Sequence, residues 1–244
     1  MPNADSVVTI FETPDELNDA ALQLSMSILQ QASSGAPVHF VLAGGSTPKR
    51  LYELLAEQKT IPWKHIHIWF GDERTVGPDH DDSNYKMAFD SLLKNISIPE
   101  ENVHRMRGED DPSEAATAYR DEIAAAVPFN TSGMPVFDLV ILGLGEDGHC
   151  ASLFPDTSAL DEESLSVVEN VVPQQDTVRI TLTNSVLNAA KDVLFLAAGD
   201  SKAEAVEAVF TGGDDAPPAA RVRPAPGRLH WFVDRAAASK LPGD

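Results

Sequence analysis

The residues best suited to chemistry lie in the run FDLVILGLGEDGHCASLFP (137–155), where an apolar segment gives way to glycines and then to Asp147 and His149. A histidine has an ordinary pKa of about 6.5, which suits a general base that activates water or relays a proton. Asp147 could orient that ring or contact a sugar hydroxyl. A loop histidine is more often an ordinary surface residue, but the glycine-rich acidic turn at a strand end favours the catalytic interpretation.

The same turn imitates a dinucleotide-binding motif, because residues 143–148 read G-x-G-x-x-G after an apolar run. Two features argue against that interpretation. Glu146 and Asp147 would set negative charge against a pyrophosphate, and Pro155 interrupts the long helix that should follow. The glycines instead predict a sharp turn that exposes His149.

No metal site is expected from this sequence. Cys150 is the only cysteine, which excludes an internal disulfide and a site with several thiolate ligands. No basic partner for Cys150 is identifiable, so we expect it to face the core as a small apolar residue. His65 and His67 alternate along a strand and could suggest a metal pair, but no third ligand with matching spacing is evident.

A second candidate motif is the turn in VHFVLAGGSTPKRLYELL, where a strand ends at Gly44 and Gly45. Glycines let the backbone approach a ligand closely, and the free amides and dipole of the next helix attract a phosphate. Ser46 or Thr47 can cap that helix, and Pro48 suits its first turn. A tight turn with a good cap would use the same residues, so the motif alone leaves both interpretations open.

Further charged residues could complete a site. Asp72, Glu73 and Arg74 follow the strand in HIHIWFGDER, and Arg74 could hold or polarise a carboxylate, phosphate or carbonyl oxygen. Arg179 lies in RITLT, and Lys202 opens a helix in AAGDSKAEAV close enough to a strand end to complete an anion site. The alternatives are a surface ion pair for the acidic pair and Arg74, a strand-edge position for Arg179 and a solvated helix start for Lys202.

The hydrophobic pattern predicts an α/β fold, Rossmann-like, with a mainly parallel sheet flanked by helices. The expected strands are Val7–Phe11, Val38–Leu42, His65–Phe70, Phe137–Leu142, Val193–Ala197 and Leu229–Val233. The expected helices are Pro14–Gln31, Pro48–Glu57, Asn84–Leu93, Pro112–Ala126, Ser185–Ala190 and Lys202–Phe210.

Two stretches, Asp156–Pro173 and Thr211–Arg228, are rich in proline, glycine or acidic residues and are expected to be irregular. The second could be a flexible flap over the site, although a surface connection is favoured. Because ligands bind at the carboxyl ends of parallel strands, the segments GGSTP, GDER and GEDGH, which each follow a predicted strand, are expected to form one site.

Composition sets the remaining expectations. A chain of 244 residues with 43% hydrophobic and 23% charged residues suits a single domain over residues 1–244. The net charge of −20 argues against nucleic acid or an anionic membrane as a partner, though a few local donors could still hold a small anion. The N-terminal sequence has no signal-peptide pattern and no apolar run is long enough to span a bilayer, so we expect a cytoplasmic location. The oligomeric state is open, with a monomer plausible.

With these segments assembled, the chain resembles the 6-phosphogluconolactonase family nearly end to end. The resemblance is carried by LAGGSTPKRLYELL, IWFGDERTVGPDHDDSNYKMAF, FDLVILGLGEDGHCASLFP, RITLTNSVLNAAKDVLFLAAGDSKAEAV and LHWFVDRAA. It implies the fold shared with glucosamine-6-phosphate deaminase and ribose-5-phosphate isomerase, and hydrolysis of a phosphorylated sugar lactone without cofactor or metal. It also implies that His149 is the catalytic base and that the 6-phosphate is held by Gly44, Gly45, Ser46, Thr47, Arg179 and Lys202. Asp147, Arg74 and Asp72 are expected beside the base as further catalytic residues.

Two other functions stay open at this point. The deaminase branch resembles this chain in its GSTP-type turn, acidic pair and DGH turn, but there a glutamate follows the DGH turn. Here Phe154 stands at that position, and Arg74 stands where the deaminases usually have tyrosine. A sugar-phosphate sensor without activity is the third possibility, and the presence of His149 and the absence of a DNA-binding module argue against it.

Overall fold

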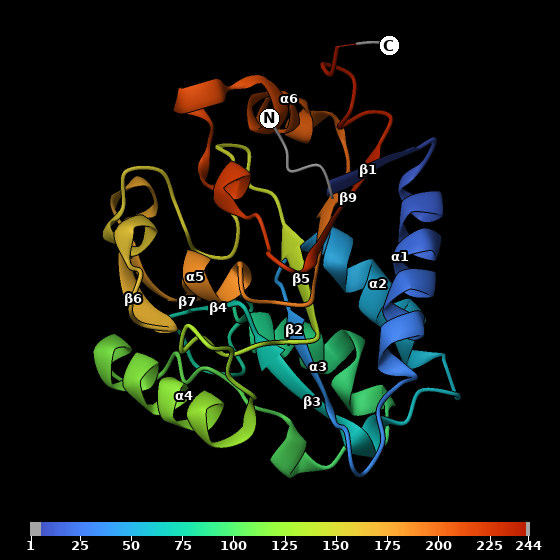
Figure 1. The fold of residues 1–244 in the computed structure, drawn as a ribbon, viewed down its shortest axis with the longest axis vertical. Coiled ribbons are helices and arrows are strands. Elements are labelled where there is room, and N and C mark those ends of the chain that lie inside the picture. The colour runs from blue at the N-terminus through green and yellow to red at the C-terminus, as the bar shows by residue number, and fades with distance from the viewer. Residues whose placement is uncertain (1–5, 243–244) are drawn as a thin grey trace.

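The computed structural model describes residues 6–242 and places a six-stranded sheet at its centre (Figure 1). The spatial order of the strands is β1 (Ser6–Phe11), β9 (Arg228–Asp234), β8 (Asp192–Ala197), β5 (Leu139–Gly143), β2 (Val38–Leu42) and β3 (Ile66–Phe70). Every neighbouring pair in this sheet runs parallel. The predicted sheet is therefore confirmed, and all six expected strands are present with ends displaced by two residues at most.

Helices cover both faces of this sheet because its strands are apolar on both sides. In β5, Leu139 and Ile141 belong to one apolar cluster while Val140 and Leu142 belong to the other. The first cluster includes residues of α1 (Pro14–Leu29), α2 (Ser46–Ala56) and α3 (Asn84–Ser91). The second includes residues of α4 (Pro112–Ala126), α5 (Asn184–Leu187) and α6 (Ala203–Thr211). All six predicted helices are found, α5 being shorter than expected.

A second, three-stranded sheet was not predicted. It is antiparallel, with the order β4 (Asp72–Arg74), β7 (Thr177–Leu182), β6 (Val167–Val172). The expectation that Asp156–Pro173 is irregular is therefore wrong for its second half. The run VVENVV is short, follows an acidic stretch and ends at Pro173, so its local pattern is weak. Pairing with β7 and packing against α4 stabilise β6 as a strand.

The stretch between α6 and β9 contains only two single-turn 3-10 helices, η7 (Gly213–Asp215) and η8 (Pro218–Arg221). This agrees with the predicted irregular connection. Within residues 6–242 no helix combines the length and apolar character needed to cross a membrane.

Candidate active site

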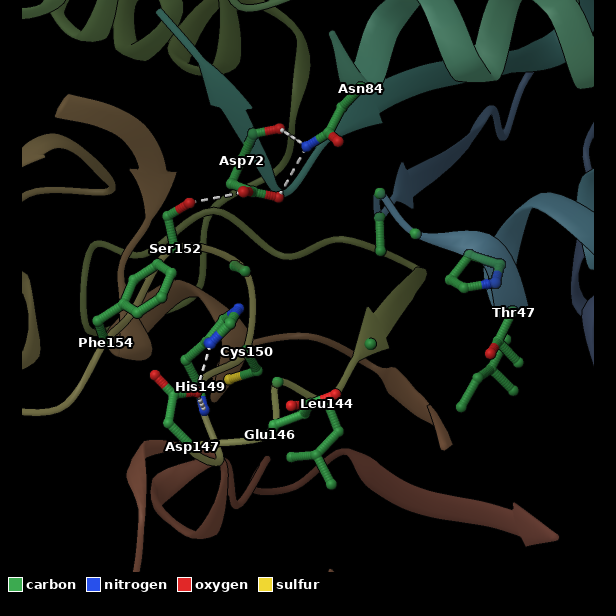
Figure 2. A pocket seen from close by; sticks show the side chains of 18 of the residues that line it. Thr47, Asp72, Asn84, Leu144, Glu146, Asp147, His149, Cys150, Ser152 and Phe154 are labelled. Carbon is green, nitrogen blue, oxygen red and sulfur yellow. Dashed lines mark hydrogen bonds and ion pairs between the residues drawn. The ribbon is translucent and has the colours of Figure 1, made fainter. Parts of the chain in front are cut away.

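A cavity of about 540 Å³ lies at the carboxyl ends of β2, β5 and β8. It is bordered by every site residue expected from the sequence, namely Gly44, Gly45, Ser46, Thr47, Asp72, Arg74, Asp147, His149, Arg179 and Lys202. The prediction that the glycine turn, the GDER segment and the GEDGH segment meet at one place is thus fulfilled geometrically. Figure 2 shows the cavity with side chains from the three segments around it.

His149 is held on two sides. Its Nδ1 lies 2.5 Å from Oδ1 of Asp147 (Figure 2), and its ring stacks on Phe154 with centroids 3.9 Å apart. Because Nδ1 is engaged by the carboxylate, Nε2 is the nitrogen available to a water or substrate. One quarter of the side chain, 25%, stays exposed. The pair therefore has the geometry of an oriented general base.

Glycine is required at two positions around His149 because side-chain atoms of other residues lie very close to the backbone there. A Cβ on Gly145 would lie 2.1 Å from Nδ1 of His149, so any side chain there would displace the ring. Gly148 has φ of +76°, and a Cβ on it would lie 2.3 Å from Cβ of Pro217. Ala219 N–H also donates to the carbonyl of Gly148 at 3.0 Å. The connection between α6 and β9 thus packs behind the catalytic loop, and none of its residues is among those that border the cavity.

The glycine turn before α2 differs from its expected form in one respect. Gly45 occupies the N-cap with φ of +100°, the helix starts at Ser46, and no side chain makes a capping hydrogen bond. The expectation that Ser46 or Thr47 caps the helix is therefore wrong, since both lie inside the first turn. The amide of Lys49 donates a hydrogen bond to the carbonyl of Gly45 at 3.1 Å, which closes the first turn of the helix. Gly44, Gly45, Ser46 and Thr47 all border the cavity, and the start of a helix is a favourable place for an anion.

Arg74 and Arg179 are directly paired neighbours on β4 and β7. Arg74 donates to the carbonyl of Asp82 and Arg179 to the side chain of Gln175. The Nε of each arginine is buried and has no hydrogen-bond partner among the described residues. Neither guanidinium forms a salt bridge within residues 6–242. Burial, and then repulsion from Arg74, lower the pKa of Arg179. Two adjacent cations that form no salt bridge within residues 6–242 suit a doubly charged anion.

Glu73 is structural. Its carboxylate accepts hydrogen bonds from the amides of Asn84 at 2.7 Å and Tyr85 at 2.8 Å and from the hydroxyl of Ser83 at 3.0 Å. These groups start α3, so Glu73 fixes that helix beside β4. Burial raises the pKa of Glu73 against the opposing effect of these hydrogen bonds. With Asp72 and Glu73 both buried, the alternative of a surface ion pair is wrong.

Asp72 is 7% exposed, and both of its carboxylate oxygens are engaged. Oδ2 accepts from the hydroxyl of Ser152 at 2.6 Å, and Oδ1 accepts from Nδ2 of Asn84 at 3.1 Å (Figure 2). Neither Ser152 nor Asn84 was singled out from the sequence. Asp72 lies 80 residues before Ser152, so no local pattern could have found Ser152.

The structure also shows the positions of three other residues considered in the sequence analysis, Lys202, Cys150 and His67. Lys202 ends the 3-10 turn η6 (Asp200–Lys202) at the N-cap of α6 and borders the cavity. Cys150 is 1% exposed, and burial raises its pKa, which confirms the expected core position. Nδ1 of His67 lies 3.0 Å from Nε2 of His104. Within residues 6–242 no group of three or more His, Cys, Asp or Glu side chains is arranged to hold a metal ion.

Comparisons with known proteins give one consistent result. The profile of the family described as "Glucosamine-6-phosphate isomerases/6-phosphogluconolactonase" matches residues 12–231. The chain is 43% identical over 204 residues to "6-phosphogluconolactonase" of Synechocystis sp., covering 82% of this chain and 83% of that protein.

Solved structures agree with the sequence comparison. The structure "6-phosphogluconolactonase from Trypanosoma cruzi" superposes with a TM-score of 0.88 at 30% identity, covering 100% of this chain and 99% of the other. A monomeric glucosamine-6-phosphate deaminase shares the fold with a TM-score of 0.78 at 22% identity, covering 96% of this chain and 99% of the other.

Proposed function

The chain belongs to the glucosamine-6-phosphate isomerase/6-phosphogluconolactonase family, and we propose that it hydrolyses 6-phospho-D-glucono-1,5-lactone with a water activated by His149. The product is 6-phospho-D-gluconate, and the reaction belongs to the oxidative pentose phosphate pathway. The observation that carries the residue assignment is the His149–Asp147 pair, which borders the same cavity as two adjacent arginines that form no salt bridge in the described part of the chain.

The reaction needs only proton transfer and charge stabilisation. Nε2 of His149 takes a proton from water as the water oxygen bonds to the lactone carbonyl carbon. The tetrahedral intermediate then collapses, the bond from this carbon to the ring oxygen breaks, and His149 returns the proton to that oxygen. Asp147 accepts a hydrogen bond from Nδ1–H, which keeps the ring in the required tautomer and stabilises the imidazolium between the two steps.

The remaining groups bind the anionic end of the substrate. We assign the 6-phosphate to the turn formed by Gly44, Gly45, Ser46 and Thr47, together with Arg179 and Lys202. Arg74, expected from the sequence as a catalytic residue, is the paired neighbour of Arg179. We assign the oxyanion of the tetrahedral intermediate to Arg74 or to a backbone amide of the catalytic loop. This chemistry uses no redox cofactor.

Phe154 favours lactone hydrolysis over deamination. It stands where a deaminase-type site would supply a glutamate, and its ring stacks on His149 instead of presenting a carboxylate to the substrate. The site then offers one imidazole base and no second acid at that position. This matches a reactive lactone better than an amino sugar phosphate.

The test is a stopped-flow or coupled assay on freshly generated 6-phosphogluconolactone, corrected for spontaneous hydrolysis, with ammonia release from glucosamine 6-phosphate measured in parallel. We expect accelerated lactone opening and no ammonia. Ammonia release without lactone opening would replace the proposal by the deaminase, and binding of sugar phosphate without either activity would replace it by a sensor. A cytoplasmic location remains our prediction, to be checked by cell fractionation. Light scattering would determine the oligomeric state, which the sequence leaves open.

A further inference from the structure

Ser152 joins the catalytic loop to all three strands of the small sheet. It lies three residues after His149 and is fully buried, at 0% exposure. Its hydroxyl donates to Oδ2 of Asp72 on β4 at 2.6 Å, and its amide donates to Oγ1 of Thr181 on β7 at 3.1 Å. Its carbonyl accepts from Nδ2 of Asn170 on β6 at 2.8 Å. Every polar group of this one residue therefore fixes the loop to a different strand.

The contact with Asp72 continues toward the phosphate turn. Asp72 accepts from Nδ2 of Asn84 through Oδ1 at 3.1 Å and through its backbone carbonyl at 2.9 Å. The Asn84 side chain lies against Gly44, where an added Cβ would be 2.1 Å from Oδ1 of Asn84. Figure 2 shows the line of contacts from Ser152 through Asp72 to Asn84. It connects the loop that carries the base with the turn that we assign to the phosphate.

We propose that Ser152 and Asp72 are positioning residues that fix the place of His149 relative to the phosphate turn. This inference rests on the proposed function and refines the sequence-based expectation that Asp72 is itself catalytic. Both carboxylate oxygens of Asp72 already accept hydrogen bonds from protein groups, so the carboxylate acts as a brace between two loops. Such a brace matters because a displacement of about 1 Å can cost about 100-fold in rate.

The first experiment compares Ser152→Ala with Ser91→Ala. Both changes remove a buried serine hydroxyl, but Ser91 is 4% exposed and donates only within α3, to the carbonyl and sulfur of Met87. We expect Ser152→Ala to lower kcat about tenfold or more with KM changed less than about threefold, because the groups assigned to the phosphate stay in place. Ser91→Ala should leave both constants near the starting values. Thermal unfolding shows that each variant folds. Equal kcat in the two variants overturns the proposal.

The same change in a His149→Ala background separates positioning from general loss of structure. A residue that acts through His149 has nothing left to position there, so Ser152→Ala should lower the residual rate less than twofold. A full tenfold fall in both backgrounds contradicts the proposal. A starting enzyme without lactonase activity, or a fully active His149→Ala variant, instead contradicts the proposed function or its base.

A second variant keeps the inference testable if Ser152→Ala does not fold. Asn at position 72 has a single side-chain acceptor for the two donors, Ser152 and Asn84, so Asp72→Asn breaks the brace from the other end. We expect a fall in kcat of about tenfold or more and, because Asn84 packs on Gly44, a rise in KM as well. Asp72→Asn with unchanged kcat overturns the proposal.

Discussion

Two groups of histidines lie at different ends of the central sheet. His149 follows the carboxyl end of β5, whereas His39 and His67 sit near the amino ends of β2 and β3. There Nδ1 of His67 lies 3.0 Å from Nε2 of His104, and Nε1 of Trp69 donates to Nδ1 of His39 at 3.2 Å. Trp69 also stacks on His104 at 3.8 Å between centroids. We call His39, His67 and His104 the histidine cluster.

The difference shows that neighbours decide what an imidazole does. His149 has a carboxylate on Nδ1 and an open cavity beside its ring, which are the requirements of a base. The cluster histidines have aromatic rings and one another as neighbours, and Oε2 of Glu122 lies 3.4 Å from Nδ1 of His104, but none of the three histidines borders the cavity. Burial, and then the charge of His67, lower the pKa of His39 and of His104 to about 4 each, and burial lowers that of His67. The cluster is therefore neutral at physiological pH and serves as packing.

Removal of the base should give the largest effect. We expect His149→Ala to lower kcat for lactone opening by about 100-fold or more, within the usual contribution of general-base catalysis. Binding of 6-phosphogluconate should change little, because the assigned phosphate groups remain. His65→Ala, which changes a histidine outside both the cavity and the cluster, is the matched control. Stopped-flow rates corrected for spontaneous hydrolysis measure both, and equal rates in the two variants would remove His149 from the mechanism.

Arg179 should affect binding more than chemistry. Arg179→Ala removes one of the two adjacent guanidiniums, and a charged hydrogen bond is worth about 1.5–3 kcal/mol, so we expect KM to rise by about ten- to 100-fold. Arg50→Ala removes an arginine paired with Glu53 outside the cavity and should leave KM unchanged. The measurement is the substrate dependence of the initial rate. A normal KM for Arg179→Ala would show that Arg179 serves only to hold the β6–β7 turn through Gln175.

Gly145 tests the packing of the His149 ring. An added Cβ would lie 2.1 Å from Nδ1 of His149 and 2.7 Å from Oδ1 of Asp147, so Gly145→Ala must disturb the His149–Asp147 pair. We expect kcat to fall about tenfold while KM changes little. Gly35→Ala is the control, because an added Cβ there meets nothing within 4 Å. Unchanged kcat in Gly145→Ala would mean that the ring position in the complex differs from that seen here.

The sequence predicted the central sheet and the residues that border the cavity, because both depend on local signals. Apolar runs identify strands such as β2 and β5, and glycines with polar residues after a strand mark its carboxyl end. The small sheet escaped prediction because β6 gains its stability from pairing with β7 and packing on α4. The proposed role of Ser152 could not be predicted for the same reason. It depends on contacts with Asp72, Thr181 and Asn170, which form only in the folded chain.

The histidine cluster should give the smallest effect on activity and a distinct effect on stability. His104 lies outside the cavity, so kcat/KM of His104→Gln at pH 7.5 should stay within about twofold of the value for the unaltered protein. The unfolded chain binds protons on His39 and His104 near the ordinary pKa of about 6.5, while the folded chain binds them only near 4. Between these values the unfolded state holds more protons. The contribution of the cluster to the free energy of unfolding is therefore fully present above about pH 6.5 and is lost as the pH drops toward 4.

Carboxyl groups with a raised pKa, such as Glu73 and Glu122, affect stability with the opposite sign. Groups that face the cluster are Asp138 and Lys191 near His39 and Glu122 near His104, where Oε2 of Glu122 lies 3.4 Å from Nδ1. Urea unfolding at pH 7.5 and pH 5 measures the loss, and His104→Gln, which has one fewer titrating ring, should lose less between the two values. An identical loss in His104→Gln and in the unaltered protein would assign the acid sensitivity to other groups. The cluster would then have no titration of its own in this range.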